Sequence, residues 1–164
     1  MELLKTILPK NNPRKELNHI YVDNDNMVAT DTTIMIIKKN ILSIDKPLLI
    51  INTHAKDDIK SNDILDNMMI NYCDAPNYPD YKRIVPKVEN ITKLPDKYSF
   101  INTLYQITSE HGVMFDYVKN APLYKKMNKL LGEVEAYQVR DKKSIVVIYS
   151  GDYKIIMMPL VVWL

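Results

Sequence analysis

The stretch Tyr78–Lys87, with the sequence YPDYKRIVPK, combines two prolines, two tyrosines and an aspartate with three cationic residues. Neither Pro79 nor Pro86 can donate a ladder hydrogen bond, and each favours an extended conformation of the residue before it. Residues 80–85 are therefore predicted to form a short edge strand. Its two faces would carry Tyr81, Arg83 and Val85 on one side and Lys82 and Ile84 on the other.

An edge strand bordered by prolines and carrying one arginine has two interpretations. It can form a shallow groove for a peptide, because apolar side chains beside a single cation suit such a ligand. It can also be a purely structural corner. The residues of this stretch alone leave both interpretations open.

The composition limits the class of protein. The 164 residues are enough for one domain, or for two small halves that share a core, without disulfides or metal. The formal net charge of +2 lacks the strong basic excess of a protein that holds DNA by bulk electrostatics. Cys73 is the only cysteine, which excludes an internal disulfide and indicates a reducing compartment. No stretch has the pattern of a secretory signal or a membrane span, so the sequence predicts a cytoplasmic protein.

The apolar pattern predicts an α+β fold with antiparallel sheets, two or three helices on one side, and a single domain over residues 1–164. A short helix is expected at Leu3–Leu8, and Asp23–Asp25 is expected to form a hairpin turn. Residues 57–72 are expected to be a short helix or turn leading into a strand, and residues 88–107 fit a strand or a helix. Short strands are expected at 17–22, 27–29 and 34–37, and further strands at 46–53, 133–139, 144–150 and 153–164. A second helix is expected to be capped by Asn120 and to end at Gly132.

Tests for catalytic and metal-binding motifs are negative. His19, His54 and His111 have no metal-ligand spacing with one another or with Cys73. There is no glycine-rich phosphate loop, and the DNDN sequence at 23–26 lacks the glycine and distal glutamate of a calcium loop. We therefore expect no metal and no cofactor.

A metal-dependent nuclease is the enzyme class that comes nearest, because Pro-Asp pairs occur at 79–80 and 95–96. Such a site also needs a second acid followed two residues later by a lysine. None of the candidate acids has that lysine: Glu89, Glu110, Glu133 and Glu135. We therefore expect a protein that is not an enzyme.

Three segments of the chain resemble segments of a known family. YPDYKRIVPK is similar to FPDYRRVIPK of the bacterial β sliding clamp, the processivity factor of the replicative DNA polymerase. VATDTT, at residues 28–33, resembles that family's ATDGHR strand, and KIIMMPLVVWL, at residues 154–164, resembles its closing MPMRL. The three segments occur in the family's order.

The resemblance implies a DNA-clamp-like fold in which these segments form an apolar pocket for short linear motifs of DNA polymerase and other DNA-handling proteins. A methionine and proline wall adapts to Leu or Phe anchors, and an arginine at the mouth can hold a carboxylate or carbonyl. The peptide-binding residues implied by position are Thr30, Thr33, Pro79, Arg83, Ile84, Ile156, Met158 and Pro159, with Leu160 at the rim.

The chain also departs from the family. Thr32, Thr33 and Ile34 stand where the family has Gly-His-Arg, so the specificity for peptides is expected to differ or be lost. A full clamp subunit carries three domains and two subunits close a ring, whereas this chain is long enough for about one domain. The resemblance is therefore to the short clamp-like proteins of phages and mobile elements, and a ring would require a homo-oligomer.

The clamp fold turns its helices towards DNA. In LYKKMNKLL, at residues 123–131, helical spacing separates an apolar face from Lys125, Lys126 and Lys129. Three such contacts would give a salt slope of about −3, too weak for tight binding by one chain but suited to a mobile lining repeated around a ring. A solvated helix face remains the alternative. The apolar tail at 161–164 is expected to be buried against its own sheet or a neighbour.

The leading interpretation is a processivity-factor-like replication protein that binds partner peptides and slides on duplex DNA. The alternative is a clamp-fold adaptor or decoy that binds peptides without encircling DNA. A nuclease is the third and least supported interpretation.

Overall fold

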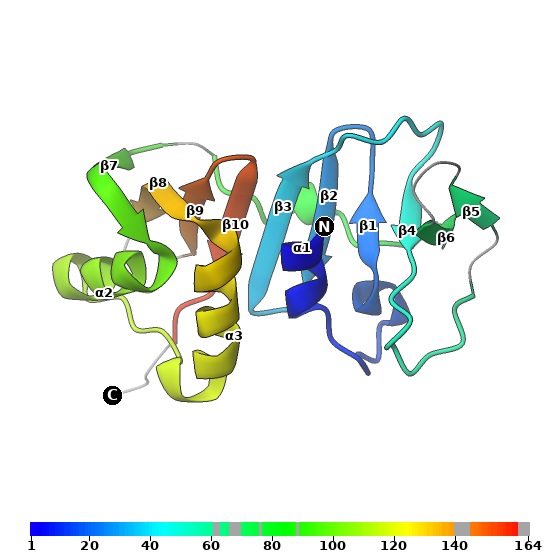
Figure 1. Cartoon of the computed structure of the whole chain (residues 1–164), viewed down its shortest axis with the longest axis horizontal. Coiled ribbons are helices and arrows are strands. Elements are labelled where there is room, and N and C mark those ends of the chain that lie inside the picture. Colours follow the sequence, from blue (N-terminus) through cyan, green and yellow to red (C-terminus); the bar gives the residue numbers. More distant parts are fainter. Residues whose placement is uncertain (61–62, 66–69, 76, 88, 140–144, 161–164) are drawn as a thin grey trace. The chain divides into compact units, whose positions relative to one another are not determined.

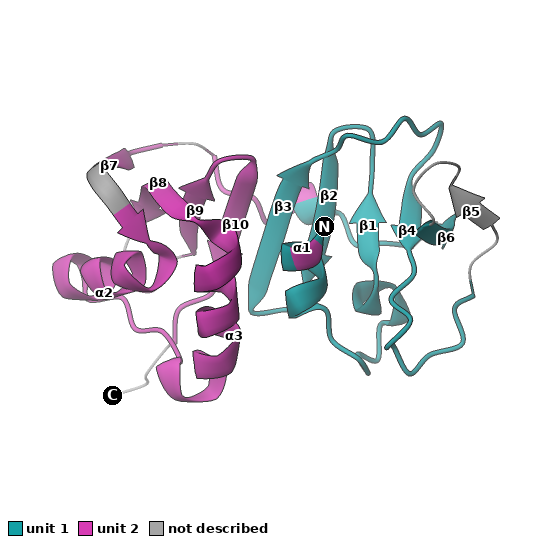
Figure 2. Cartoon of the chain, in the orientation of Figure 1, with its two compact units in different colours: residues 1, 3–81 teal, residues 2, 82–164 magenta. Residues whose placement is uncertain are grey.

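The structure is a computed structural model that describes residues 1–60, 63–65, 70–75, 77–87, 89–139 and 145–160. The chain divides into two compact units, residues 1 and 3–81 (unit 1) and residues 2 and 82–164 (unit 2), as Figure 2 shows. Among the described residues there are ten strands, three α-helices and two 3-10 helices (Figure 1). The predicted α+β class, with antiparallel strands and three helices, is confirmed. That residues 1–164 act as a single domain stays a prediction.

Unit 1 contains an antiparallel sheet with the strand order β5-β6-β4-β1-β2-β3. The predicted turn at Asp23–Asp25 is confirmed, because Asp23 Oδ1 accepts hydrogen bonds from the backbone N–H groups of Asp25 and Asn26. The elements of unit 1 are α1 (Glu2–Ile7), η1 (Lys15–Asn18), β1 (Ile20–Val22), β2 (Asn26–Thr30), β3 (Ile34–Lys39), β4 (Leu48–Ile50), β5 (Asp63–Leu65) and β6 (Ile70–Asp74).

The sheet of unit 1 has two different faces, because successive side chains of a strand alternate. Ile20 lies opposite Ile50 in the ladder, and Ile50 borders a cleft together with residues of α1, so these side chains are on the helix-bearing face. Tyr21 therefore points to the other face, which it shares with its ladder partner Val28. Both faces are covered, since Ile20 and Val28 are each at most 1% exposed.

Unit 2 contains an antiparallel sheet with the order β10-β9-β8-β7. Its two long helices have side-chain caps, because Ser99 Oγ accepts from the N–H of Asn102 and Asp116 Oδ1 accepts from that of Lys119. The elements of unit 2 are β7 (Ile91–Ser99), α2 (Phe100–His111), α3 (Tyr117–Leu131), β8 (Glu133–Val139), β9 (Val146–Ser150) and β10 (Tyr153–Met157).

Three sequence predictions need correction. The predicted edge strand at 80–85 is wrong, because a 3-10 helix, η2, occupies Tyr81–Arg83. The second helix of unit 2 begins at Tyr117 with Asp116 as its cap, so Asn120 is inside it and Pro122 is an internal proline. The last strand ends at Met157, before residue 164, and residues 161–164 lie outside the described part of the chain.

Two open alternatives are now settled. The stretch 88–107, which fitted a strand or a helix, contains both in its described part, because β7 ends at Ser99 and α2 begins at Phe100. In the described part of 57–72 there is no helix, and the strands β5 and β6 are present instead.

Candidate functional site

Two tyrosines attach the Tyr78–Lys87 stretch to unit 1. The ring of Tyr78 stacks on Tyr21 with the centroids 4.3 Å apart and the planes 13° from parallel. The Tyr81 hydroxyl donates to Asp23 Oδ2 and accepts from Asn26 Nδ2, both at 2.9 Å. Its side chain is buried at 4% exposure. This pair of anchors, rather than strand pairing, fixes the backbone on either side of Pro79.

The anchored segment shares a sheet face with Thr30. Tyr78 stacks on Tyr21, whose ladder partner is Val28. Thr30 follows Val28 by two positions on β2, so its side chain points to the same face. Two of the three resembling segments of the sequence therefore meet one face of the unit 1 sheet, opposite the face that carries α1.

The turn at residues 30–34 satisfies its own polar groups. Thr30 Oγ1 is buried, donates to the carbonyl of Ile34 at 2.9 Å and accepts from the N–H of Thr32 at 3.0 Å. Asp31 Oδ1 accepts from the Thr33 hydroxyl at 2.8 Å and from the backbone N–H groups of Thr33 and Ile34. Thr32 has φ +81°, a left-handed conformation that costs energy for a β-branched residue. The exposed side chain of Thr33 is therefore held in place by Asp31.

In unit 2 the face opposite the long helices carries Ile156. The Tyr137 hydroxyl donates to Glu110 of α2, which places Tyr137 on the helix-bearing face. The next residue, Gln138, is on the other face together with its ladder partner Val147, and Val147 pairs in turn with Ile156. Ile156 is only 3% exposed, so it contributes packing rather than an open surface.

The end of the Tyr78–Lys87 stretch reaches this same face of unit 2. The side-chain amide of Gln138 donates to the carbonyl of Lys87 at 3.0 Å. Arg83 ends η2 with an exposed side chain, and the Ile84 side chain after it is 40% exposed. These two residues therefore precede a backbone segment that Gln138 fixes on the sheet.

The segment after β10 presents apolar side chains to solvent. The N–H of Leu160 donates to the carbonyl of Met114 at 2.8 Å, which fixes this segment beside the loop between α2 and α3. Met114 and Met158 are both 49% exposed and Leu160 is 45% exposed, while Pro159 is half-buried. We call Met114, Met158 and Leu160 the methionine patch. It is the kind of surface that adapts to varied apolar ligands.

The predicted pocket residues divide between the two units. Thr30, Thr33 and Pro79 belong to unit 1, and the others belong to unit 2: Arg83, Ile84, Ile156, Met158, Pro159 and Leu160. Within each unit the structure brings its members into the arrangements given above. That the two sets form one pocket stays a prediction.

Sequence reasoning missed several supporting residues. Tyr21, Asp23 and Asn26 hold the tyrosine anchors, and the polar Asp23–Asn26 turn was assigned only a local role. Met114 was missed because nothing in its own sequence context indicates the bond to Leu160. The tyrosines of YPDY were the one available signal, since a buried tyrosine needs a hydrogen-bond partner.

The three lysines assigned to DNA contacts lie on the exposed side of α3. Tyr124, Met127 and Leu131 of this helix are buried, whereas Lys125, Lys126 and Lys129 are exposed. The predicted separation of an apolar and a cationic face is confirmed. Contact of these lysines with DNA stays a prediction.

Two titratable side chains with shifted pKa values, His19 and Tyr137, each have a carboxylate partner within the fold. Burial lowers the pKa of His19, against the opposing influence of Asp57, whose Oδ2 lies 3.1 Å from His19 Nε2. His19 Nδ1 accepts from the backbone N–H of Asn52, which also favours the neutral ring. Burial and the hydrogen bond to Glu110 raise the pKa of Tyr137 to about 12. Among the described residues, no group of three or more His, Cys, Asp or Glu side chains could hold a metal ion, and no helix is long and apolar enough to cross a membrane.

No protein-family model matches this chain, and no curated protein does. Solved structures match it in fold. The DNA polymerase III β chain of Streptococcus pneumoniae matches with a TM-score of 0.58 and 14% identity, covering 98% of this chain and 63% of that chain. The Helicobacter pylori β clamp, solved bound to a DNA ligase peptide, matches with a TM-score of 0.60 and 15% identity, covering 98% and 62%. The Thermotoga maritima β subunit matches with a TM-score of 0.57 and 13% identity, covering 99% and 63%.

These likenesses show that the chain has the fold of the bacterial β clamps, as the sequence predicted. The chain spans less than two thirds of the length of these clamps. The assignment to the phage or mobile-element type stays a prediction.

Proposed function

We propose that this chain is a sliding-clamp-like replication accessory protein, without enzymatic activity, that binds short linear motifs of DNA polymerase or other DNA-handling proteins. The fold supports this proposal, and one protein of the same fold was solved with a DNA ligase peptide bound. The observation that carries the proposal is the tyrosine-anchored segment Tyr78–Tyr81, which lies on the sheet face that Thr30 shares.

Within each unit, taken by itself, the residue types suit an apolar peptide. In unit 1 the anchors hold Pro79 as a rigid wall beside a face that is otherwise packed. In unit 2 the methionine patch and Ile84 present side chains that are 40–49% exposed. Leu or Phe anchors of a motif would bury these surfaces, and burial of apolar area gives about 25 cal/mol per Å². Arg83 supplies a donor for a carboxylate or carbonyl of the peptide.

The direct test is titration of a fluorescently labelled QLxLF-type peptide against the wild type and Arg83→Ala. Loss of the arginine is expected to cost about 1–3 kcal/mol of binding, or about 5–150-fold in Kd. Arg14→Ala is the matched control, because Arg14 is also an exposed arginine but lies before η1 in unit 1. Equal affinities for all three proteins would contradict the role of Arg83, and no binding by the wild type would contradict the proposed function.

A second candidate is a clamp-fold adaptor that binds peptides without encircling DNA. The formal charge of +2 favours it, because 22 basic residues are nearly balanced by 20 acidic ones, so one chain attracts phosphates only weakly. Retention on circular but not on linear DNA would support the sliding protein, and no retention on either would support the adaptor. Light scattering at micromolar concentration tests the self-assembly that a ring requires.

A further inference from the structure

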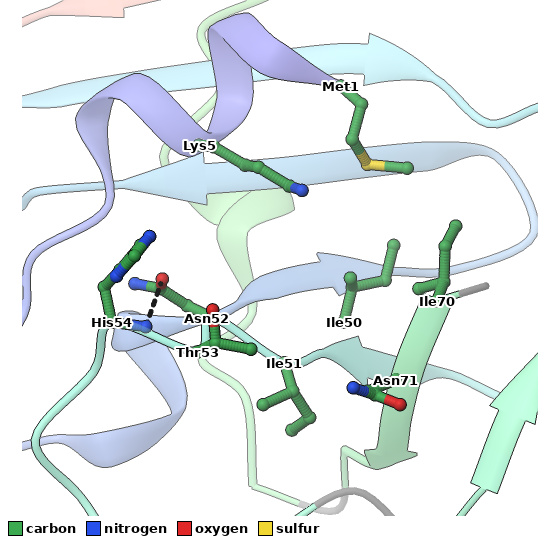
Figure 3. A pocket seen from close by; sticks show the side chains of 9 residues that line it. All are labelled: Met1, Lys5, Ile50, Ile51, Asn52, Thr53, His54, Ile70 and Asn71. Carbon is green, nitrogen blue, oxygen red and sulfur yellow. Dashed lines mark hydrogen bonds between the residues drawn. The ribbon is translucent and has the colours of Figure 1, made fainter. Parts of the chain in front are cut away.

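Unit 1 contains a cleft of about 200 Å³ beside α1, lined in part by Met1, Lys5, Ile50, Asn52 and His54. In Figure 3 the Lys5 ammonium group points toward Met1 and Ile50. Asn52 and His54 lie on the other side of the cleft, where the backbone N–H of His54 donates to Asn52 Oδ1. The charged group and the polar side chains of this cleft therefore do not converge on one ligand.

The outer face of α3 in unit 2 has a more regular arrangement. A line of exposed residues runs along it at intervals of four, three and four positions, which places them on one side of a helix: Val118, Pro122, Lys125 and Lys129. We call these four residues the α3 stripe. The stripe is apolar over its first turns and cationic over its last.

The apolar end of the stripe is open to solvent. Val118 is 94% exposed. Tyr105 of α2 is 57% exposed, and its ring stacks on that of Tyr117, the first residue of α3, with the centroids 5.2 Å apart and the planes 17° from parallel. This stack fixes the Tyr105 ring at the same end of α3 as Val118. Covering the two side chains would remove apolar area from water, which favours association.

The charge of α3 is one-sided. The helix contains no aspartate or glutamate, and it contains four exposed lysines: Lys119, Lys125, Lys126 and Lys129. Within the part of the chain that the structure describes, none of these lysines makes a hydrogen bond or an ion pair. Lys125 and Lys129 are four residues apart, and like charges at this spacing destabilise a helix. Carboxylates of a partner would relieve this repulsion.

The apolar end distinguishes between two kinds of anionic partner. Duplex DNA would meet the lysines with phosphates, but its backbone offers no apolar counterpart to Val118 and Tyr105. An amphipathic helix with acidic residues can present carboxylates and apolar side chains on the same face. The stripe is about 16 Å long at the helical rise of 1.5 Å per residue, which about three turns of a second helix would cover.

We propose that the α3 stripe binds an acidic amphipathic helix of a partner protein. The apolar side chains of that helix cover Val118 and Tyr105, and its carboxylates pair with the lysines of the stripe. This partner is additional to the linear motifs of the proposed function, and it gives these lysines a role that needs no DNA.

The experiment is an NMR titration of the full chain, isotopically labelled, with a synthetic helical peptide. The peptide carries glutamates in its first turns and leucines on the same face in its last turns. This order suits antiparallel packing on α3, and acids near the start of a helix also stabilise it. A Kd on the order of 0.1 mM is expected for so small a surface. The same peptide with glutamine in place of glutamate, and a duplex oligonucleotide, are titrated separately.

Val118→Ser separates the two partners, because it removes apolar area and leaves every charge in place. It should weaken binding of the acidic peptide about 5-fold, as partial burial of a valine side chain implies, and leave binding of the duplex unchanged. Ile41→Ser is the matched control, because Ile41 is 70% exposed and lies in unit 1, between β3 and β4. Lys125→Gln should weaken binding of the peptide about 3-fold, as expected for an exposed ion pair. Amide spectra that overlay the wild type outside the changed residue confirm that each variant is folded.

Shifts confined to α3 and Tyr105, with weaker binding of the glutamine peptide, would support the proposal. No shifts on α3 at roughly ten times the expected Kd, equal binding of the glutamine peptide, or equal affinities of Val118→Ser and Ile41→Ser would overturn it. Binding of the duplex alone would make the stripe a nucleic-acid surface, and shifts of the stripe that depend on protein concentration would assign it to a second copy of the chain; either result would also overturn it.

The test is independent of the proposed function. The acidic peptide has no QLxLF-type motif, so its binding should leave the Met158 methyl signal unchanged and should persist when a QLxLF-type peptide is present. Failure of the acidic peptide to bind would therefore leave the proposed function standing, and failure of the QLxLF-type peptide to bind would leave the α3 stripe standing.

Discussion

The two tyrosines of YPDY allow a matched test of how this segment is held. Each Tyr→Phe change removes one hydroxyl and keeps the ring. The Tyr81 hydroxyl bonds to Asp23 and Asn26, both at 2.9 Å, at a site where Tyr81 is 4% exposed. A hydrogen bond to a charged group contributes about 1.5–3 kcal/mol, so Tyr81→Phe should lower the free energy of unfolding by about 2 kcal/mol.

Tyr78→Phe should not lower the free energy of unfolding as Tyr81→Phe does. The Tyr78 hydroxyl is buried and has no hydrogen-bond partner among the described residues, and this burial raises its pKa. An unsatisfied buried hydroxyl costs about 1–3 kcal/mol, part of which the phenylalanine removes. The stacking on Tyr21 is kept. We expect Tyr78→Phe to leave stability unchanged or to raise it by up to about 1 kcal/mol.

Equilibrium unfolding in urea, followed by far-UV circular dichroism, measures both variants. For a chain of this length the loss in Tyr81→Phe corresponds to a decrease in Tm of about 4–8 °C. If Tyr81→Phe and Tyr78→Phe lower the free energy of unfolding equally, the inference that only the Tyr81 hydroxyl makes stabilising hydrogen bonds is refuted. If Tyr81→Phe loses none, the anchoring of the segment by Asp23 is refuted.

Three further outcomes are expected. Burial lowers the pKa of His19, so the unfolded state binds a proton at this histidine more readily than the folded state does. The stability that depends on neutral His19 is therefore fully present above the unfolded pKa of about 6.5 and is lost as the pH falls below it. The urea midpoint should decrease from pH 7.5 to 5.5, and it should decrease less in His19→Gln. Gly112→Ala should cost about 1 kcal/mol of unfolding free energy in the same assay, because Gly112 has φ +66° at the end of α2, and a Cβ there would meet no atom within 4 Å, so backbone strain alone is measured. If the chain contacts duplex DNA through Lys125, Lys126 and Lys129 of α3, changing these three lysines to glutamine should reduce the slope of log K against log salt by about 2.7, measured by fluorescence anisotropy. An unchanged slope would remove these lysines from the DNA surface.

The strands of the sheets could be predicted because their side chains repeat with a period of two over buried faces. Residues 133–139 show this clearly, since Val134, Ala136 and Gln138 alternate with exposed or helix-facing neighbours. The Asp23–Asp25 turn was also predictable, because its hydrogen bonds are local. Local chemistry is sufficient for such elements.

The edge strand at 80–85 was wrong because its competitor is distant in sequence. Asp23 lies 58 residues before Tyr81, and the bond between them draws the backbone into a 3-10 turn. Tertiary contacts of this kind override local propensity and leave no local pattern. The early start of α3 is different, because its signal is local: Asp116 Oδ1 accepts from the N–H of Lys119 and caps the helix one residue before Tyr117.

The candidate site was predictable only in part. The resemblance named Pro79, Thr30 and Met158, but the anchors that position Pro79 and the bond that positions Met158 depend on residues outside the resembling segments. Supporting residues of a site are chosen by packing, so they follow from coordinates and not from motifs.

The central prediction is that one peptide contacts both the pocket residues assigned to unit 1, among them Thr33, and those assigned to unit 2, among them Ile84 and Met158. Methyl NMR of the QLxLF-type peptide complex tests it directly, through intermolecular NOEs from the leucine methyl groups of the peptide. We predict NOEs to the Thr33 methyl group of unit 1 and also to the Met158 and Ile84 methyl groups of unit 2. NOEs to one unit alone, or to neither set, would contradict the claim.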